Sequence, residues 1–361
     1  MFDLTDWVTT TPYSMDKIEK SAKLTSALSD LTRRHYRTCE PYQNILDAVG
    51  FNKSKVSSCA DIPYLPVRLF KELDLLSVPR DEVVKTMTSS GTTGQAVSRI
   101  FLDRATSANQ MKVLTKIVSS FIGGQRLPML ILDCPAVVKD RAMFSARGAG
   151  ILGFSLFASD KAFALDDNME LNVDVVNAFL EKHSGKNILL FGFTFMVWLH
   201  FYKALIKSGV SLDLSRGILI HGGGWKKLVN EAISSSDFRN RLNELCGISK
   251  IHDYYGMVEQ TGSIYMECEQ GYLHTSIFSD VIVRRPIDFS VAPIGERGIV
   301  EVLSVLPGSY PGHALLTEDE GAILGEDDCP CGRLGKYFKI FGRLKNAEIR
   351  GCSDTYTARI S

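Results

Sequence analysis

The stretch TSSGTTGQ, Thr88 to Gln95, follows a strand-like run (DEVVKTM) and precedes a segment with helical periodicity from Arg104 to Phe121. Its glycines, Gly91 and Gly94, permit positive φ angles and let the backbone come close to a ligand. Amide and hydroxyl groups in such a loop can bind phosphate oxygens. The loop lacks the Gly-Lys-Ser/Thr ending of a Walker A motif. It is therefore a phosphate-binding loop of another kind or a solvent-exposed turn, and the surrounding sequence must decide between the two.

Strand-like and helical segments alternate around this loop. From Glu82 onward the strand-like runs are VVKTMTSS, LPMLILDCP, NILLFGF, SRGILIHGGG and SKIHDYYG, with helical stretches such as 104–121 and 174–183 between them. Buried strands that alternate with helices indicate an α/β fold with a largely parallel sheet. After about Gly271 strands and turns dominate, which predicts an antiparallel β subregion packed on the main one.

The composition limits the class of protein. The chain has 361 residues, and its 41 basic and 41 acidic side chains argue against bulk attraction to nucleic acid or to an anionic membrane. A hydrophobic content of 45% and a charged content of 23% exclude a disordered or collagen-like chain. No apolar run reaches the length of a membrane span, and the N-terminus lacks the pattern of a signal peptide. We expect a cytoplasmic protein with no nucleic-acid partner and no stable membrane insertion.

Four further motifs follow the glycine loop in order. They are HGGGWKK (221–227), YYGMVEQTG (254–262), LLTEDEG (315–321) and FGRLKNAEIRG (341–351). Together with TSSGTTGQ, their order and spacing resemble the adenylate-forming superfamily of acyl- and aryl-CoA ligases, luciferases and related synthetases. The resemblance implies the large N-terminal domain of that fold, with mixed sheets and flanking helices, and activation of a carboxylic acid by ATP and Mg²⁺.

The resemblance also assigns roles to individual residues. The family's phosphate loop corresponds to Ser89, Ser90, Gly91, Thr92, Thr93 and Gly94. The turn that lines the adenine and acyl pockets corresponds to Gly222, Gly223 and Gly224, and the aromatic residue on adenine to Tyr255, which Gly256 follows. Glu259 matches the magnesium ligand, Asp319 the carboxylate on the ribose hydroxyls, and Arg343 an arginine that also reaches the ribose. The chemistry agrees, because attack on the α-phosphate requires charge neutralisation, which carboxylate-held Mg²⁺ provides. The alternative to these roles is that Glu259 and Asp319 are ordinary solvated carboxylates.

Two positions depart from the superfamily pattern. Val97 replaces the common lysine of the phosphate loop, and Val258 replaces a usual threonine. The missing lysine favours the phenylacetate-CoA ligase branch, which tends to lack it. Val258 lacks the hydroxyl contact that this threonine supplies, which argues against a high affinity for the nucleotide.

A cysteine and histidine set follows the third motif. Cys268-x5-His274 and Cys329-x-Cys331 supply three thiolates and one imidazole, which suit tetrahedral Zn²⁺. The CPCGR string and the C-x5-H placement resemble the phenylacetate-CoA ligase branch, in which some members carry such a zinc. Four protein ligands leave no open position, so the predicted role is structural. The alternative is four residues without metal.

The C-terminal string IRGCSDTYTARI contains Cys352. Adenylating ligases usually continue past a GRLK-type hinge into a mobile domain with a catalytic lysine, whereas this sequence ends at Ser361, so we expect that domain to be reduced to a stub. A thiol near the nucleotide site could attack an acyl-adenylate and form a thioester, with Arg343 or Arg350 lowering its pKa. With PVRLFK, FGFTFMVW and RGCSD, this arrangement resembles the LuxE-type acyl-protein synthetases of the bacterial bioluminescence fatty-acid reductase complex. In that family a cysteine near the C-terminus accepts the acyl group and passes it to a reductase.

The expected activity is ATP-dependent conversion of a long-chain fatty acid to acyl-AMP, transfer to Cys352 and then to an acyl reductase or another acceptor protein. The predicted catalytic residues are Cys352, Glu259 and Arg343. The alternatives are an acyl- or aryl-CoA ligase of the phenylacetate type and a non-catalytic acyl-binding subunit. A homo- or hetero-oligomer is compatible with the sequence.

The predicted organisation has three parts. Residues 1–80 form a mainly helical region, and residues 81–340 form the adenylate-forming core with a zinc subregion at about 265–335. Residues 341–361 form a hinge-like segment and the tail with the acyl-accepting cysteine. Within the core, the apolar run 191–201 is either the lining of an acyl tunnel or a buried strand that continues into a core helix.

Overall fold

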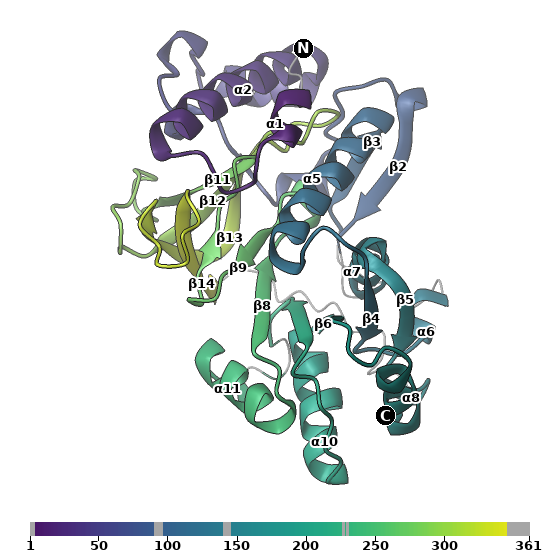
Figure 1. Cartoon of the computed structure of the whole chain (residues 1–361). Coiled ribbons are helices and arrows are strands. Elements are labelled where there is room, and N and C mark those ends of the chain that lie inside the picture. The colour runs from purple at the N-terminus through teal and green to yellow at the C-terminus, as the bar shows by residue number, and fades with distance from the viewer. Residues whose placement is uncertain (1–3, 90–96, 140–145, 226–227, 229–230, 345–361) are drawn as a thin grey trace. The chain divides into compact units, whose positions relative to one another are not determined.

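The computed structural model describes residues 4–89, 97–139, 146–225, 228 and 231–344 (Figure 1). The described residues fall into two compact units. One unit contains residues 4–89, 97–120 and 256–344, and the other contains the described residues between 121 and 255.

The second unit is built on five parallel strands. They are β4 (Leu127–Ile131), β5 (Ala158–Phe163), β6 (Ile188–Phe193), β7 (Gly217–Gly222) and β8 (Lys250–Tyr255). Their order in the sheet is β5–β4–β6–β7–β8. Every residue of β6 and β7 is buried, as expected for a parallel sheet covered on both faces. The carboxyl ends of these strands lie at one edge, where doubly wound folds bind their ligands.

Helices cover both faces of this parallel sheet. They are α6 (Ala136–Lys139), α7 (Ala146–Phe154), the 3₁₀ turn η5 (Ser155–Phe157), α8 (Val173–Lys182), α9 (Thr194–Met196), the π-helix η6 (Val197–Tyr202), α10 (Lys203–Ser208) and α11 (Ser235–Cys246). Leu190 of β6 packs in one cluster with Phe179 of α8 and Phe201 of η6. Its neighbour Phe191 points to the opposite face and stacks on Phe154 of α7, with ring centroids 4.2 Å apart. Alternation along β6 therefore supplies apolar side chains to both layers.

The apolar run 191–201 passes directly from β6 into α9 and η6. Residues 191–198 are all buried, and the Trp198 ring stacks on Tyr202 with centroids 4.4 Å apart. A Cβ atom added at Gly192 would lie 2.9 Å from the Cβ of Leu132, so a larger residue does not fit there. The run is thus a buried strand that continues into a core helix, and a role as the lining of an acyl tunnel stays a prediction.

The first unit is built on an antiparallel sheet. Its strands are β9 (Tyr265–Glu267), β10 (Leu273–His274), β11 (Ser279–Arg284), β12 (Gly298–Ser304), β13 (Ala314–Glu326) and β14 (Lys336–Arg343). Their order is β11–β12–β13–β14–β10–β9, and β1 (Leu65–Pro66) adds to β13 in parallel. The predicted α/β fold with an antiparallel subregion is confirmed.

The helices of the first unit lie mainly in its N-terminal part. They are α1 (Thr5–Thr9), α2 (Lys17–Thr38), α3 (Glu40–Ala48), α4 (Leu69–Glu72), α5 (Arg104–Ile122) and the 3₁₀ turns η1 (Lys53–Lys55), η2 (Cys59–Asp61), η3 (Arg80–Glu82) and η8 (Val258–Gln260). Asp16 caps α2 by accepting a hydrogen bond from the Glu19 N–H, and Leu24, Leu28 and Leu31 form its buried stripe. No helix within the described ranges is long and apolar enough to cross a membrane.

One strand differs from the sequence interpretation. The run that contains β2 (Val83–Thr88) was expected among the strands of the main sheet, but β2 pairs antiparallel with β3 (Arg99–Asp103) in a separate two-stranded sheet. The interpretation was wrong for this strand because no side chain of β2 is fully buried, whereas a central parallel strand buries both of its faces. The pair β2–β3 brackets the glycine loop.

Candidate functional site

Reciprocal hydrogen bonds close the base of the predicted phosphate loop. The Ser89 N–H donates to the Ser98 carbonyl (3.2 Å), and the Ser98 N–H donates to Ser89 Oγ (2.9 Å). Next to this pair, Thr88 and Arg99 face each other across β2 and β3. The predicted loop residues Ser90, Gly91, Thr92, Thr93 and Gly94 lie outside the described residues, so their phosphate contacts stay a prediction.

The predicted adenine turn lies at the carboxyl ends of β7 and β8. Gly222 ends β7 opposite Tyr254 of β8, and Tyr255 is the last residue of β8. Gly223 and Gly224 have φ angles of 81° and 65°, in the left-handed region that favours glycine. A Cβ atom at Gly223 would also lie 2.5 Å from the ring of Phe193. The local structure therefore favours glycine at Gly223 and Gly224 through the backbone, and at Gly222 because a Cβ atom there would lie 2.7 Å from the Tyr254 ring. The role of this turn and of Tyr255 in binding adenine stays a prediction.

Thr194 supports this turn from the neighbouring strand. It follows β6, and its hydroxyl donates to the Gly222 carbonyl (3.2 Å) and lies 2.9 Å from Nδ1 of His221. Thr194 and His221 are both buried. The sequence interpretation did not assign Thr194; the available signal was a lone hydroxyl residue at the end of a buried apolar strand.

Glu259, the predicted magnesium ligand, lies in the short turn η8. Its side chain is only 2% exposed, and its carbonyl accepts a hydrogen bond from the Tyr310 hydroxyl (2.9 Å). The amide of Gln260 donates to the carbonyls of Val302 and Gly312. These bonds fix the turn against β12 and the segment before β13. The turn therefore holds the Glu259 carboxylate in a fixed, nearly inaccessible position, and its role as a magnesium ligand stays a prediction.

Asp319 and Arg343, the two predicted ribose residues, face each other on adjacent strands. They are register partners in β13 and β14, with Arg343 Nε 3.9 Å from Asp319 Oδ1. The Asp319 N–H donates to Thr317 Oγ1, and this hydroxyl donates to the Val300 carbonyl. The structure therefore brings a carboxylate and a guanidinium together on a braced part of the sheet.

The proposed zinc ligands come together from two distant parts of the chain. One ligand atom from each of Cys268, His274, Cys329 and Cys331 lies within 4.8 Å of all the others. Sγ of Cys268 is 4.0 Å from Sγ of Cys329, and Sγ of Cys331 is 3.4 Å from Nε2 of His274. Tetrahedral zinc, with bonds of about 2.3 Å to sulfur and 2.0–2.1 Å to nitrogen, requires edges of roughly 3.8 and 3.6 Å. The four residues fit a zinc ion.

The surroundings of the cluster also suit a metal. Burial lowers the pKa of His274 to about 4, so its imidazole is neutral and available as a ligand. Burial disfavours the thiolate of Cys331, but hydrogen bonds from Arg333 and from the other thiols hold its pKa below the usual value. The Gln270 N–H points to Sγ of Cys268 at 3.4 Å. Thiolates stabilised by amide and guanidinium donors are typical of metal-binding turns.

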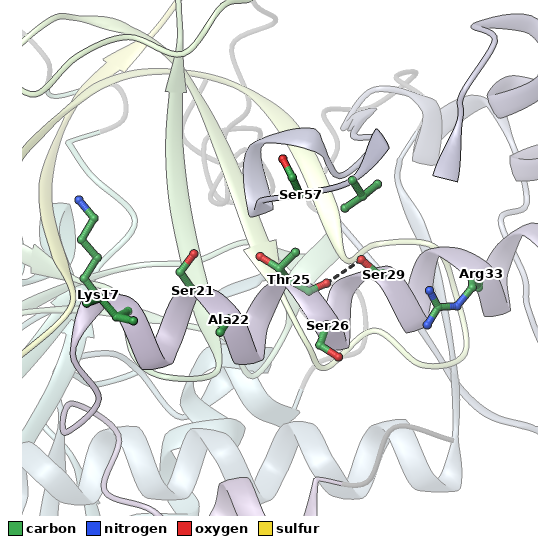
Figure 2. Close-up of a pocket in the computed structure, with 10 residues that line it drawn as sticks. Lys17, Ser21, Ala22, Thr25, Ser26, Ser29, Arg33 and Ser57 are labelled. Atoms are coloured by element: carbon green, nitrogen blue, oxygen red, sulfur yellow. Dashed lines mark hydrogen bonds between the residues drawn. The ribbon is translucent and has the colours of Figure 1, made fainter. Parts of the chain in front are cut away.

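A groove of about 690 Å³ runs along α2 and is also lined by Val56 and Ser57 (Figure 2). Small hydroxylated side chains such as Ser21, Thr25 and Ser29 line it, and Lys17 and Arg33 stand at its two ends. The Ser29 hydroxyl donates to the carbonyl of Thr25 (2.7 Å), so part of this polarity is satisfied within the helix. None of the predicted site residues lines the groove.

The predicted site residues belong to both units. Gly222, Gly223, Gly224 and Tyr255 belong to one, and Ser89, Gly256, Glu259, Asp319, Arg343 and the zinc ligands belong to the other. Cys352 lies outside the described residues, so its role as acyl carrier stays a prediction.

The fold of this chain is similar to that of a solved ligase. The chain superimposes on the crystal structure of 2-hydroxyisobutyryl-CoA ligase in complex with 2-HIB-AMP and CoA with a TM-score of 0.71 and 16% identity, over 92% of this chain and 71% of that one. A second structure of the same ligase, in its postadenylation state, gives a TM-score of 0.71 at 17% identity. The fold is that of an adenylate-forming ligase, as predicted.

The sequence comparison gives the family. The model of the acyl-protein synthetase LuxE family matches residues 3–361, and the chain belongs to this family of enzymes. A long-chain-fatty-acid–luciferin-component ligase of Vibrio harveyi is 23% identical over 95% of this chain and 90% of that protein. A protein of the same name from Aliivibrio fischeri is 24% identical over 88% of this chain and 84% of that protein. The predicted family and the predicted type of enzyme are both confirmed.

Proposed function

We propose that this enzyme activates a long-chain fatty acid with ATP, binds the acyl group on Cys352 and delivers it to an acceptor protein such as a fatty-acyl reductase. The observation that carries the proposal is the family match over residues 3–361, which includes the nucleotide motifs and Cys352. The two relatives, named as ligases of long-chain fatty acids, support the substrate class.

In the first step a carboxylate oxygen of the fatty acid attacks the α-phosphorus of ATP. The bond between that phosphorus and the bridging oxygen breaks, and pyrophosphate leaves. The residues of this chain act by holding the nucleotide: Ser89 to Gly94 on the phosphates, Gly222 to Gly224 with Tyr255 on adenine, and Asp319 with Arg343 on the ribose. Positioning and charge neutralisation are the main sources of rate in such a reaction.

Glu259 is the proposed ligand of the magnesium ion. Bound Mg²⁺ neutralises phosphate charge and orients the leaving group. The burial of the Glu259 side chain and the bonds that fix turn η8 support this role, since a fixed ligand does not have to be ordered when the ion binds.

In the second step the Cys352 thiolate attacks the acyl carbonyl carbon of acyl-AMP. The bond from this carbon to the phosphate oxygen breaks, AMP leaves, and a thioester remains on Cys352. A thiol or another nucleophile of the acceptor protein then takes the acyl group and frees the cysteine.

The zinc proposed at Cys268, His274, Cys329 and Cys331 has a structural role. A set of four protein ligands leaves no coordination position for substrate. Its ligands come from β10, the turn after β9 and the turn before β14, so a bound ion would tie these elements together.

Pyrophosphate exchange into ATP, measured across straight-chain, branched and aromatic acids without coenzyme A, tests the first step. We expect exchange that depends on a long straight-chain acid and falls at least about a hundredfold in Glu259→Gln. Glu267→Gln, which changes another buried glutamate of the same unit, is the matched control and keeps most of the exchange. Release of AMP that requires coenzyme A and no acceptor protein would instead indicate a CoA ligase.

A further inference from the structure

Arg333 connects the two turns that carry the cysteine ligands. It lies two residues after Cys331; burial raises the pKa of the Cys331 thiol, and the neighbouring Arg333 is among the groups that bring this pKa below its usual value. The guanidinium also forms two hydrogen bonds with Glu269, at 2.5 Å from Nη1 to Oε2 and 3.1 Å from Nη2 to Oε1. Glu269 follows Cys268 directly, so one side chain spans from one ligand turn to the other.

The position of Arg333 also suits the charge of a loaded cluster. Three thiolates and one neutral imidazole around Zn²⁺ carry a net charge of −1. The Arg333 side chain is only 16% exposed, so its positive charge is weakly screened next to the Cys331 sulfur. Its forked donors can bind a sulfur and a carboxylate at once, which a lysine cannot do with the same geometry.

The same guanidinium reaches the N-terminal segment. It lies over the ring of Tyr13 at 6.0 Å from the centroid, and this ring meets His274 edge-on at 6.2 Å. The Tyr13 carbonyl accepts from the Leu334 N–H (3.1 Å), and the Pro12 carbonyl accepts from the Ile277 N–H (2.7 Å). The backbone just before α2 is therefore pinned to both sides of the cluster.

We propose that Arg333 is a positioning residue that holds the Cys331 sulfur and the Glu269 turn at coordination distance and couples the loaded cluster to the N-terminal segment through Tyr13. This inference rests on the zinc proposed above. Removing a side chain that holds metal ligands in place usually lowers metal affinity by about 10–100-fold. Arg333 acts through the ligands and does not itself touch substrate.

The test measures zinc retention in the full-length protein. Wild type, Arg333→Met and Arg333→Lys are purified with one equivalent of zinc, and zinc loss to a chromogenic chelator is followed over time. We expect loss at least about tenfold faster in Arg333→Met and an intermediate rate in Arg333→Lys. Arg285→Met is the matched control, because Arg285 forms a similar two-bond pair with Glu296 away from the cluster; it should lose zinc at the wild-type rate.

Hydrogen exchange supplies a second readout. The Ile277 and Leu334 amides donate to the carbonyls of Pro12 and Tyr13. Their hydrogen-exchange rates should rise in Arg333→Met and in wild type stripped of zinc, and should stay at the wild-type value in Arg285→Met. Glu269→Gln keeps Arg333 and should accelerate zinc loss less than Arg333→Met does. If Arg333→Met does not fold, Glu269→Gln takes its place in the test.

The possible outcomes distinguish the role of Arg333 from the presence of zinc itself. Wild type that binds no zinc removes both the structural zinc and this role. Wild type that retains zinc, with Arg333→Met and Glu269→Gln losing it at the wild-type rate, overturns the role of Arg333 and leaves the zinc site intact.

Discussion

Arg343 Nε lies 3.9 Å from Asp319 Oδ1, across the pair of adjacent strands β13 and β14. The two side chains come from motifs more than twenty residues apart, and the antiparallel register makes them direct neighbours. A carboxylate and a guanidinium at this spacing can bind neighbouring hydroxyl groups of one sugar ring. Arg343 also lies 3.7 Å from Glu318 Oε2, and the role of the Asp319–Arg343 pair on the ribose stays a prediction, which the first variant below tests.

Removing the charge of Asp319 should weaken nucleotide binding. Asp319→Asn keeps the shape but loses a charged acceptor, and a hydrogen bond to a charged group contributes about 1.5–3 kcal/mol. We expect the KM for ATP in pyrophosphate exchange to rise at least about tenfold. Glu320→Gln, the adjacent residue on the same strand, is the control and should keep the wild-type KM. A KM that rises equally in both variants would show a general effect of charge on this strand.

The adenine turn should not accept a side chain at Gly223. Gly223→Ala places a Cβ atom 2.5 Å from the Phe193 ring in a backbone with φ of 81°, which should cost about 2–4 kcal/mol of unfolding free energy. Gly224→Ala meets no atom within 4 Å and should cost only the backbone strain of about 1–2 kcal/mol. Urea unfolding of both variants checks the order; equal losses would mean that the ring of Phe193 moves aside freely.

Stability should fall as the pH drops below about 6.5, because two buried histidines are neutral in the folded protein. The rings of His35 and His313 stack at 5.1 Å, and His313 Nε2 lies 2.8 Å from the Thr32 hydroxyl. Burial lowers the pKa of His313 to about 3, and burial together with His313 lowers that of His35 well below its usual value. Since the unfolded chain binds these protons at an ordinary pKa of 6.5, each histidine costs up to about 1.4 kcal/mol per pH unit below that value.

Urea unfolding between about pH 7.5 and 5 measures this dependence. His313→Gln should reduce the slope only in part, because it removes one proton-linked group while His35, His200 and His274, whose pKa values burial also lowers, remain. His183→Gln changes a buried histidine of the other unit, whose Nε2 lies 2.8 Å from Asp160 Oδ2; it is the comparison and should leave most of the slope in place. A slope unchanged in His313→Gln would assign the effect to other groups.

Loss of one zinc ligand should lower metal content and stability together. Cys331→Ser should reduce bound zinc from one equivalent to well below it and lower the melting temperature, since metal binding free energy is part of folding free energy at such sites. Cys246→Ser changes a buried cysteine of the other unit and should keep full zinc content. Metal analysis that finds no zinc in wild type purified without chelators contradicts the proposed site.

The sequence predicted those parts of the structure that local patterns determine. The buried runs 188–193 and 217–222 predicted strands of a parallel sheet, and the glycines at 222–224 predicted a tight turn at its edge. The ligand types of Cys268, His274, Cys329 and Cys331, together with the resemblance to the phenylacetate-CoA ligase branch, predicted a cluster, and the fold brings its ligand atoms within 4.8 Å of one another. The strands and the turn follow from the sequence of a single segment, and the cluster follows from the ligand preference of one metal ion.

Contacts between distant polar residues could not be predicted in the same way. Lys20 of α2 and Lys336 of β14 both contact the buried Asp280, with Nζ–Oδ distances of 3.7 and 2.7 Å, yet nothing in their local sequence distinguishes them from surface residues. Thr194 and Arg333 were missed for the same reason, because their roles depend on which segments the tertiary fold places beside them. The run 83–88 was misassigned because a two-stranded sheet and a large sheet share the same local β pattern.

Acyl labelling of the protein tests the two-step reaction most directly. Wild type and Cys352→Ala are incubated with ATP, Mg²⁺ and a radiolabelled long-chain fatty acid, and pyrophosphate exchange is measured in parallel. We predict that Cys352→Ala keeps exchange near the wild-type rate and loses all hydroxylamine-sensitive label on the protein, because only the second step uses the thiol. Label that survives in Cys352→Ala would contradict the transfer of the acyl group to this cysteine.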